Sequence, residues 1–267
     1  MTDQVTDWVT DDDEAVSALV NMVVVLADNK YALGRRLAEW AVGPPTLEGS
    51  VAGAAIGQQL LGQARVLYPV LEQLPATDLG VPEDSGRTRF YNMAAADGPW
   101  PTWAHAVCSY FLVNSACNVV LAALADSAYS DLAKRVTKMR DDERFQTQYG
   151  AGRVRELVAR YAAGGRLLQE QVDASFTEVL AWFGPHDEPG VSALARAGLV
   201  TGDNEQWRQE WLDAIGPVLE EVGIGFPADR ASADPTTGRW EWGDVPWESW
   251  TPLQRRLEQT TSRMQSV

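Results

Sequence analysis

Apolar residues recur at three- and four-residue steps in the first forty residues, which is the period of an amphipathic helix. An acidic start at Asp11 to Asp13, followed by Glu14, suits the positive end of a helix dipole. Gly43-Pro44-Pro45 stops the pattern. We therefore expect a helix from about residue 13 to residue 40. Its apolar stripe comprises Leu19, Met22, Val23, Leu26, Leu33, Leu37 and Trp40.

A second helix is predicted from Leu47 to about Leu74, with Thr46 as its N-cap. The short turn makes it an antiparallel neighbour of the first helix. Glycine in a helix interior costs roughly 1 kcal/mol relative to alanine. Close approach of a neighbouring helix would offset this cost. The second helix contains Gly49, Gly53, Gly57 and Gly62.

The remaining pattern predicts further helices over 103–124, 130–161, 167–183 and 204–222, and a short one near 90–96. The third helix is apolar on most sides, which is typical of a central bundle element. A kink is expected near Gly150 and Gly152. The rest is expected to be irregular, because it shows no strand alternation. The fold class is therefore all-α.

The tail from Pro227 to Pro252 is rich in tryptophan among proline, glycine and acidic residues. Packing of an irregular segment onto the bundle, or a subunit interface, is favoured over a ligand site, because tryptophan is enriched in both settings. The four residues are Trp240, Trp242, Trp247 and Trp250.

The 267 residues carry a formal net charge of −15, which disfavours nucleic acid and anionic membranes as partners. The acidic start lacks a basic n-region, and no uninterrupted apolar run reaches about 18 residues, so we expect neither a signal peptide nor a spanning helix. Cys108 and Cys117 fall on roughly opposite faces of one helix and cannot pair. They are expected to be buried free thiols in a reducing compartment, and the chain to be cytoplasmic.

Candidate chemistry is defined mainly by exclusion. The sequence contains no phosphate loop, dinucleotide fingerprint, nucleophile elbow or zinc-binding cysteine cluster. Helical bundles build di-iron sites from glutamates and two Glu-x-x-His pairs. The only histidines are His105 and His186, and the residues three before them are Thr102 and Phe183. A standard di-iron centre is not expected.

The first two predicted helices contain the motifs Leu26-Ala27-Asp28-Asn29, Leu33-Gly34-Arg35-Arg36-Leu37-Ala38-Glu39-Trp40, Leu47-Glu48 and Leu61-Gly62-Gln63-Ala64-Arg65. Together these motifs resemble the phenylacetate-catabolic family, and most closely the non-catalytic structural subunits of multicomponent phenylacetyl-CoA epoxidases. Those subunits are ferritin-like and pair with a catalytic di-iron paralogue. The similarity continues more weakly through Asp97-Gly98, Tyr110-Phe111, Ala133-Lys134 and Arg140. It implies one ferritin-like domain over 1–267, with a core bundle at about 11–184 and a C-terminal extension at about 185–267.

The departures from the family pattern form a set of vestigial positions, where the resemblance implies acidic residues or histidines. A cavity without metal favours neutral or cationic substitutes, because clustered carboxylates repel one another. We expect Lys138 to pair with Glu48, Asp28 or Asp142; the alternative is that residues 138–144 form a solvated helix face. The vestigial positions are Gln59, Ser115, Asn118, Lys138 and Asp142.

The resemblance implies an accessory subunit, with no catalytic residue, metal or cofactor of its own. It would dock a catalytic di-iron paralogue, or form a homo-oligomer, through bundle faces. Two alternatives remain: an iron-dependent oxygenase using Glu39, Glu48, Asp142 and Glu143, and a small-molecule binding module with a closed apolar pocket. The polar or aromatic positions carried over for helix packing and internal ion pairing are Asp28, Glu39, Trp40, Glu48, Gln63 and Arg65.

Overall fold

A computed structural model describes residues 12–74, 86–226, 231–243, 245–252 and 255–257. It is 69% helical, which confirms the all-α class. The acidic start over residues 1–11 lies outside the described residues. The helices are α1 (Asp13–Glu39), α2 (Leu47–Leu71), α4 (Trp103–Ala123), α5 (Ser130–Arg160), α6 (Gly164–Trp182), α7 (Pro189–Arg196) and α8 (Asn204–Glu221). Short 3-10 turns span Trp40–Val42, Ala94–Ala96 and Trp247–Ser249.

Side-chain caps fix the start of the first helices, as the sequence predicts. The Asp12 carboxylate accepts hydrogen bonds from the amides of Glu14 and Ala15, and the Thr46 hydroxyl accepts one from Gly49. Each cap satisfies amides that have no partner within the helix. Both predicted helix starts are therefore confirmed.

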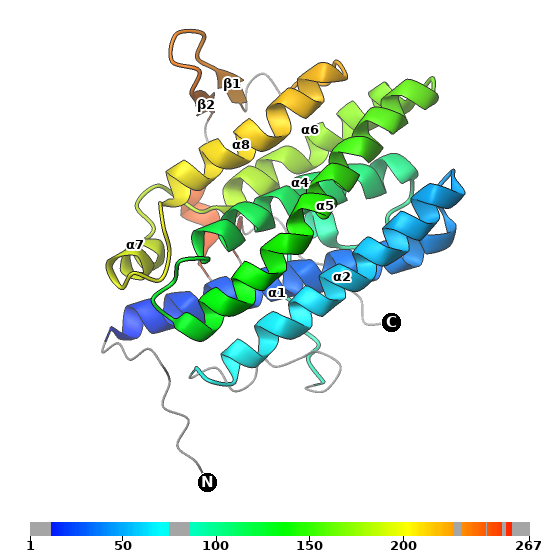
Figure 1. The fold of residues 1–267 in the computed structure, drawn as a ribbon. Coiled ribbons are helices and arrows are strands. Elements are labelled where there is room, and N and C mark those ends of the chain that lie inside the picture. The colour runs from blue at the N-terminus through cyan, green and yellow to red at the C-terminus, as the bar shows by residue number, and fades with distance from the viewer. Residues whose placement is uncertain (1–11, 75–85, 227–230, 244, 253–254, 258–267) are drawn as a thin grey trace.

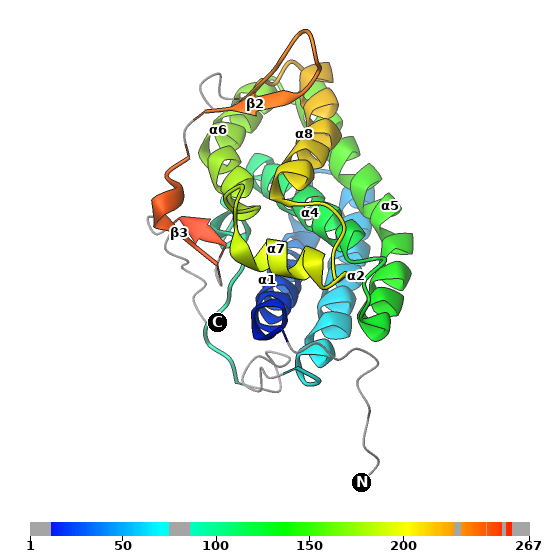
Figure 2. The same cartoon turned by 90° about the vertical axis from the view of Figure 1, so that its left-hand side faces the viewer.

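Helices α1, α2, α4 and α5 pack side by side, with α6 and α8 on the far side of α4 and the short α7 across the N-terminal half of α1 (Figures 1 and 2). The segments Asp13–Val42 and Trp103–Ala123 are long and apolar enough to cross a membrane by composition. The most apolar window of each is 78% buried within the bundle, so this feature is explained by their position in the core. The sequence criterion, an uninterrupted apolar run of about 18 residues, did not identify these two segments, because polar residues interrupt both of them.

Three of the four α2 glycines lie against another part of the chain. A Cβ added at Gly57 would meet the Gly34 carbonyl oxygen at 3.2 Å, and one at Gly53 would meet the Tyr149 hydroxyl at 3.0 Å. A Cβ at Gly49 would lie 3.3 Å from an Arg153 nitrogen. Gly62 differs, because a Cβ there would meet nothing within 4 Å. Close packing within the bundle explains the first three glycines only.

The second half of the chain contains elements that the sequence pattern did not predict. Helix α7 was missed; its N-cap is the Glu188 carboxylate, which accepts hydrogen bonds from Gly190 and Val191. Helix α5 runs from Ser130 to Arg160 without an interruption at the glycines. The tail is not wholly irregular. It forms two antiparallel pairs, β1 (Ala231–Ala233) with β2 (Trp240–Trp242) and β3 (Trp250–Thr251) with β4 (Arg256–Leu257).

Candidate functional site at the bundle centre

A fully buried lysine marks the centre of the bundle. Lys30 belongs to α1 and lies four residues after Leu26 and three before Leu33, so the helical period turns it inward with the apolar stripe. Its Nζ donates hydrogen bonds to Asn114 Oδ1 at 2.9 Å and Asn118 Oδ1 at 2.7 Å, both on α4. The two amide oxygens thus hold an ammonium group inside the core.

Glu143 of α5 supplies the opposing charge, with 9% of the residue exposed. Burial raises the pKa of Glu143, and the charges of Lys30 and Arg140 partly oppose that rise. Burial lowers the pKa of Lys30, against the opposing influence of Cys117 and Glu143. Burial also raises the pKa of Cys117 to about 12, so this thiol stays protonated. Both cysteines are free, as predicted.

Several buried polar atoms of the bundle have no hydrogen-bond partner among the described residues. Two of them belong to residues that interact with Lys30, Asn118 Nδ2 and Glu143 Oε1, and others are Gln59 Oε1 and both amide atoms of Gln146. Unpaired polar atoms are costly in a protein interior. An open pocket of about 500 Å³ reaches this cluster. It is lined by Asn118, Thr137, Arg140, Asp141, Glu143, Arg144 and Thr147.

This donor set does not fit a di-iron centre. The Lys30 ammonium repels a cation, and Glu143 is the carboxylate beside it. Iron that reacts with dioxygen takes histidine and carboxylate ligands. Among the described residues, no group of three or more His, Cys, Asp or Glu could hold a metal ion.

The vestigial positions separate in the structure. Asn118 contacts Lys30, whereas Ser115 donates a hydrogen bond to the Phe111 carbonyl oxygen of its own helix. Lys138 is exposed and forms no ion pair with any described residue, so the predicted pairing of Lys138 is wrong. Lys30 is the buried lysine instead. Sequence reasoning overlooked it, although its register with Leu26 and Leu33 was a usable signal.

Asp28, one of the family-matching positions, lies at the centre of a second polar cluster. Its carboxylate accepts hydrogen bonds from the Tyr68 hydroxyl at 2.7 Å, an Arg87 guanidinium nitrogen at 2.6 Å and the Tyr91 amide at 2.8 Å. Asn29 accepts another from the Met93 amide. The two residues tie the connection between α2 and α4 to the bundle.

The other family-matching positions have local roles. Glu39 forms an ion pair with Arg36, and Gln63 donates a hydrogen bond to the Met139 carbonyl of α5 at 3.3 Å. Glu48 and Arg65 are exposed on α2. Trp40 packs against Trp103 with ring centroids 5.5 Å apart.

Neither alternative site from the sequence is assembled by the described residues. Glu39, Glu48, Asp142 and Glu143 do not form a group that could hold a metal ion. The pocket beside Lys30 is open and polar, not closed and apolar. His105 stacks its ring on that of Trp100 and belongs to no group of described residues that could hold a metal ion.

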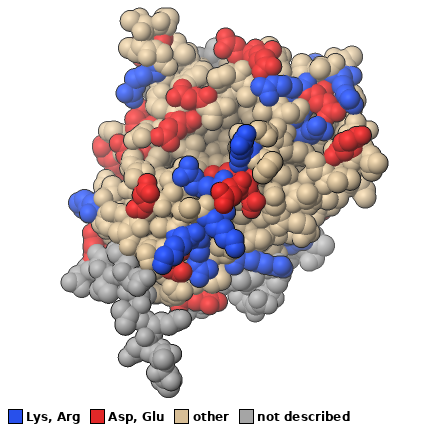
Figure 3. Space-filling model, in the orientation of Figure 1, with Lys and Arg blue, Asp and Glu red and all other residues tan. Residues whose placement is uncertain are grey.

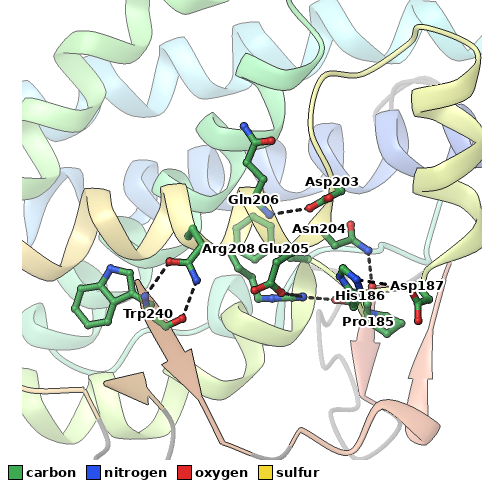
Figure 4. Close-up of polar contacts among 12 residues, drawn as sticks. Pro185, His186, Asp187, Asp203, Asn204, Glu205, Gln206, Arg208 and Trp240 are labelled. Carbon is green, nitrogen blue, oxygen red and sulfur yellow. Dashed lines mark hydrogen bonds and ion pairs between the residues drawn. The ribbon is translucent and has the colours of Figure 1, made fainter. Parts of the chain in front are cut away.

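The tail tryptophans pack onto the helices. The Gln209 side chain exchanges two hydrogen bonds with the Trp240 backbone. Figure 4 shows His186, in the loop before α7, beside Asp187. Trp242 and Trp247 flank the buried Arg208 guanidinium, and Trp250 flanks Arg255. These contacts agree with the packing interpretation of the tail.

Comparison with known proteins identifies the family. A family model described as phenylacetic acid catabolic protein matches residues 2–267. One subunit of the 1,2-phenylacetyl-CoA epoxidase of Escherichia coli (strain K12) is 23% identical over 216 residues, covering 80% of this chain and 70% of the relative. Another subunit of the same epoxidase is 24% identical over 210 residues, covering 77% of this chain and 83% of the relative. The chain therefore belongs to the phenylacetic acid catabolic family.

Proposed function

We propose that this protein is a non-catalytic accessory subunit of an aromatic acyl-CoA epoxidase complex, where it docks a catalytic di-iron paralogue. It acts in the cytoplasm as a single ferritin-like domain. The observation that supports this best is the Lys30 ammonium, held by Asn114 and Asn118 at the bundle centre. An internal cation with one neighbouring carboxylate is the opposite of a site that binds two ferrous ions. The relatives are subunits of one epoxidase by name, which supports a role within such an assembly.

The proposed division of labour places oxygenation in the partner chain. Lys30 fills the bundle centre with an amino group, and its hydrogen bonds join α1 to α4. Such a bundle keeps a helical exterior for docking while carrying out no redox chemistry. The aromatic acyl-CoA substrate of the complex is supported by the relatives, which are subunits of a 1,2-phenylacetyl-CoA epoxidase by name.

The first test is iron content by elemental analysis, after anaerobic loading with ferrous ion and removal of loosely bound metal. The catalytic paralogue from the same organism, loaded in parallel, is the positive control. We expect essentially no iron on this chain and about two ions on the paralogue. Two ions per chain here would overturn the proposal.

The second test is direct binding between the two purified chains, measured by sedimentation velocity. A defined complex supports the docking role. Absence of any complex across the micromolar range, with both chains folded, would contradict that role even if no iron is bound.

A further inference from the structure

A second pocket lies away from the bundle centre, where the tail meets α1 and α7. Figure 2 shows α7 crossing the N-terminal half of α1, with β3 of the tail on the same side of the molecule. The pocket has a volume of about 280 Å³, near the lower end of the ~300–1,000 Å³ typical of small-molecule sites. Ser17 and Pro252 lie at its exposed rim. Three segments that are far apart in the sequence therefore form one hollow that solvent can enter.

The inner wall of this pocket combines apolar side chains with one buried cation. Met22, Val191 and Leu194 are buried along it, and Arg255 is only 4% exposed. The Nε and Nη2 atoms of Arg255 donate hydrogen bonds to carbonyl oxygens at the end of α6 and to Asn204. The Nη1 atom has no hydrogen bond to a described residue and is not sealed from solvent. One guanidinium nitrogen is thus left for a ligand.

The charge of Arg255 is not balanced by an ion pair. Figure 3 shows Lys and Arg side chains next to Asp and Glu side chains on the surface, whereas Arg255 forms no ion pair with any described residue. The nearby Arg208 is paired with Glu205 at 3.2 Å. Burial lowers the pKa of Arg255 to about 10, so the group remains cationic near neutral pH. A buried cation without a counter-ion is costly, and a bound anion would remove that cost.

The two carboxylates that line the pocket already have partners. The charge of Glu188 opposes the lowering of the Arg255 pKa, but the Glu188 oxygens accept hydrogen bonds from two amides in the first turn of α7, at 2.9 and 2.6 Å. The positive end of the α7 dipole therefore offsets the charge of Glu188. Glu14 lies 3.4 Å from Arg196 at the rim. The unpaired charge in the pocket is positive.

We propose that the pocket binds a small organic carboxylate, whose anionic group pairs with Arg255 and whose apolar body packs on Met22, Val191 and Leu194. A guanidinium matches a carboxylate because it offers parallel N–H donors in a fixed plane. Arg255 has a φ of 48°, the single positive value of a non-glycine residue in the described part of the chain. Strained backbone of this kind is concentrated at ligand and active sites. The ligand would join the tail to α1 and α7.

The test is isothermal titration calorimetry of the full chain with three probes of one shape: benzoate, neutral benzamide and cationic benzylamine. We expect benzoate to bind with a dissociation constant of about 1 mM or lower, and the other two to bind at least about tenfold more weakly. Benzoate should also raise the melting temperature as its concentration rises. Hexanoate repeats the titration with an aliphatic body. The proposal fails if neither carboxylate binds, or if benzamide or benzylamine binds as tightly as benzoate.

Arg255→Gln removes the charge and keeps a donor for the carbonyl oxygens of α6. It should raise the dissociation constant of benzoate at least about tenfold and leave the weak binding of benzamide unchanged. Arg256→Gln is the matched control, because Arg256 is the neighbouring buried arginine and does not line the pocket. Circular dichroism checks that both variants are folded. Unchanged affinity in Arg255→Gln, or an equal loss in Arg256→Gln, would overturn the proposal.

A second pair of variants keeps the test decisive if Arg255→Gln does not fold. Ser17→Trp puts a large side chain at the exposed rim, and Ser192→Trp puts the same side chain at an exposed position of α7 that does not line the pocket. We expect benzoate binding to be lost in the first variant and kept in the second. Binding that survives Ser17→Trp, or is lost in both variants, contradicts the assignment of the ligand to this pocket. This inference does not rest on the proposed function, which the iron measurement tests separately.

Discussion

Asp28 and Lys30 lie two residues apart on α1, carry opposite charges, and are both fully buried, yet their surroundings differ. The Asp28 carboxylate has three hydrogen-bond donors, one of them the Arg87 guanidinium. The Lys30 ammonium has two neutral amide acceptors, and polar atoms around it remain unpaired among the described residues. One cluster is enclosed by protein partners, and the other borders an open pocket.

The difference separates two uses of a buried charge. A carboxylate with a complete set of donors orders the segments that supply them, here the connection that carries Arg87 and Tyr91. A buried polar cluster with some hydrogen bonds missing adds little net stability, because the unpaired groups have lost their contacts with water. We interpret the Lys30 cluster as a remodelled site, because Asn118 stands where the family resemblance implies histidine. The comparison therefore predicts unequal consequences of mutation.

The largest effect is expected from Asp28→Asn. This change keeps the shape but removes the negative charge of a buried ion pair and puts an amide NH2 group where a carboxylate oxygen accepted a hydrogen bond, which should lower the free energy of unfolding by about 3–5 kcal/mol. Urea denaturation followed by circular dichroism measures it. The control is Glu170→Gln, which removes an exposed i,i+4 pair with Arg166 and should cost under about 0.5 kcal/mol. A loss below about 1 kcal/mol in Asp28→Asn would contradict a structural role.

A smaller effect is expected from Lys30→Met. The substitution leaves the oxygens of Asn114 and Asn118 without a donor, at a cost of about 1–3 kcal/mol. Combining it with Glu143→Gln should cost less than the sum of the single changes, since neither charge is then buried alone. The same urea measurements on the four proteins give the coupling. Strict additivity would show that Lys30 and Glu143 do not interact.

The sequence predicts the bundle well because helix period and capping act locally. The stripe from Leu19 to Trp40 and the caps at Asp12 and Thr46 reappear in the structure. Helix α7 is only eight residues long, too short to show a periodic pattern, so its existence depends on packing against α1. The tail strands likewise depend on contacts with α8 and α6.

The site was less predictable, for a physical reason. The expectation that a cation would replace metal ions was directed at Lys138, on the basis of position in a family pattern. The helix period places Lys138 on the outside of α5 and Lys30 on the inside of α1. Spacing within α1 indicates that Lys30 points inward, but it does not show which residues of α4 meet the lysine there. Asn114 and Asn118 supply those contacts, and they depend on how α1 and α4 face each other.

The smallest expected effect is on how the free energy of unfolding depends on pH, and it tests whether the Lys30 cluster is as desolvated as the Asp28 cluster. Burial raises the pKa of Glu143 above its ordinary value of 4.5, so the folded protein holds this proton at a pH where the unfolded chain has lost it. Stability is then fully present below pH 4.5 and falls as pH rises towards the folded-state pKa, by less than about 1.4 kcal/mol per pH unit. Glu143→Gln should remove that slope from urea denaturation measured at a series of pH values, whereas the exposed control Glu170→Gln should keep it. An unchanged slope in Glu143→Gln would mean that the carboxylate is hydrated through the open pocket. Lys30 would then be the single desolvated charge of the cluster, and the contrast with the enclosed Asp28 network would rest on the lysine alone.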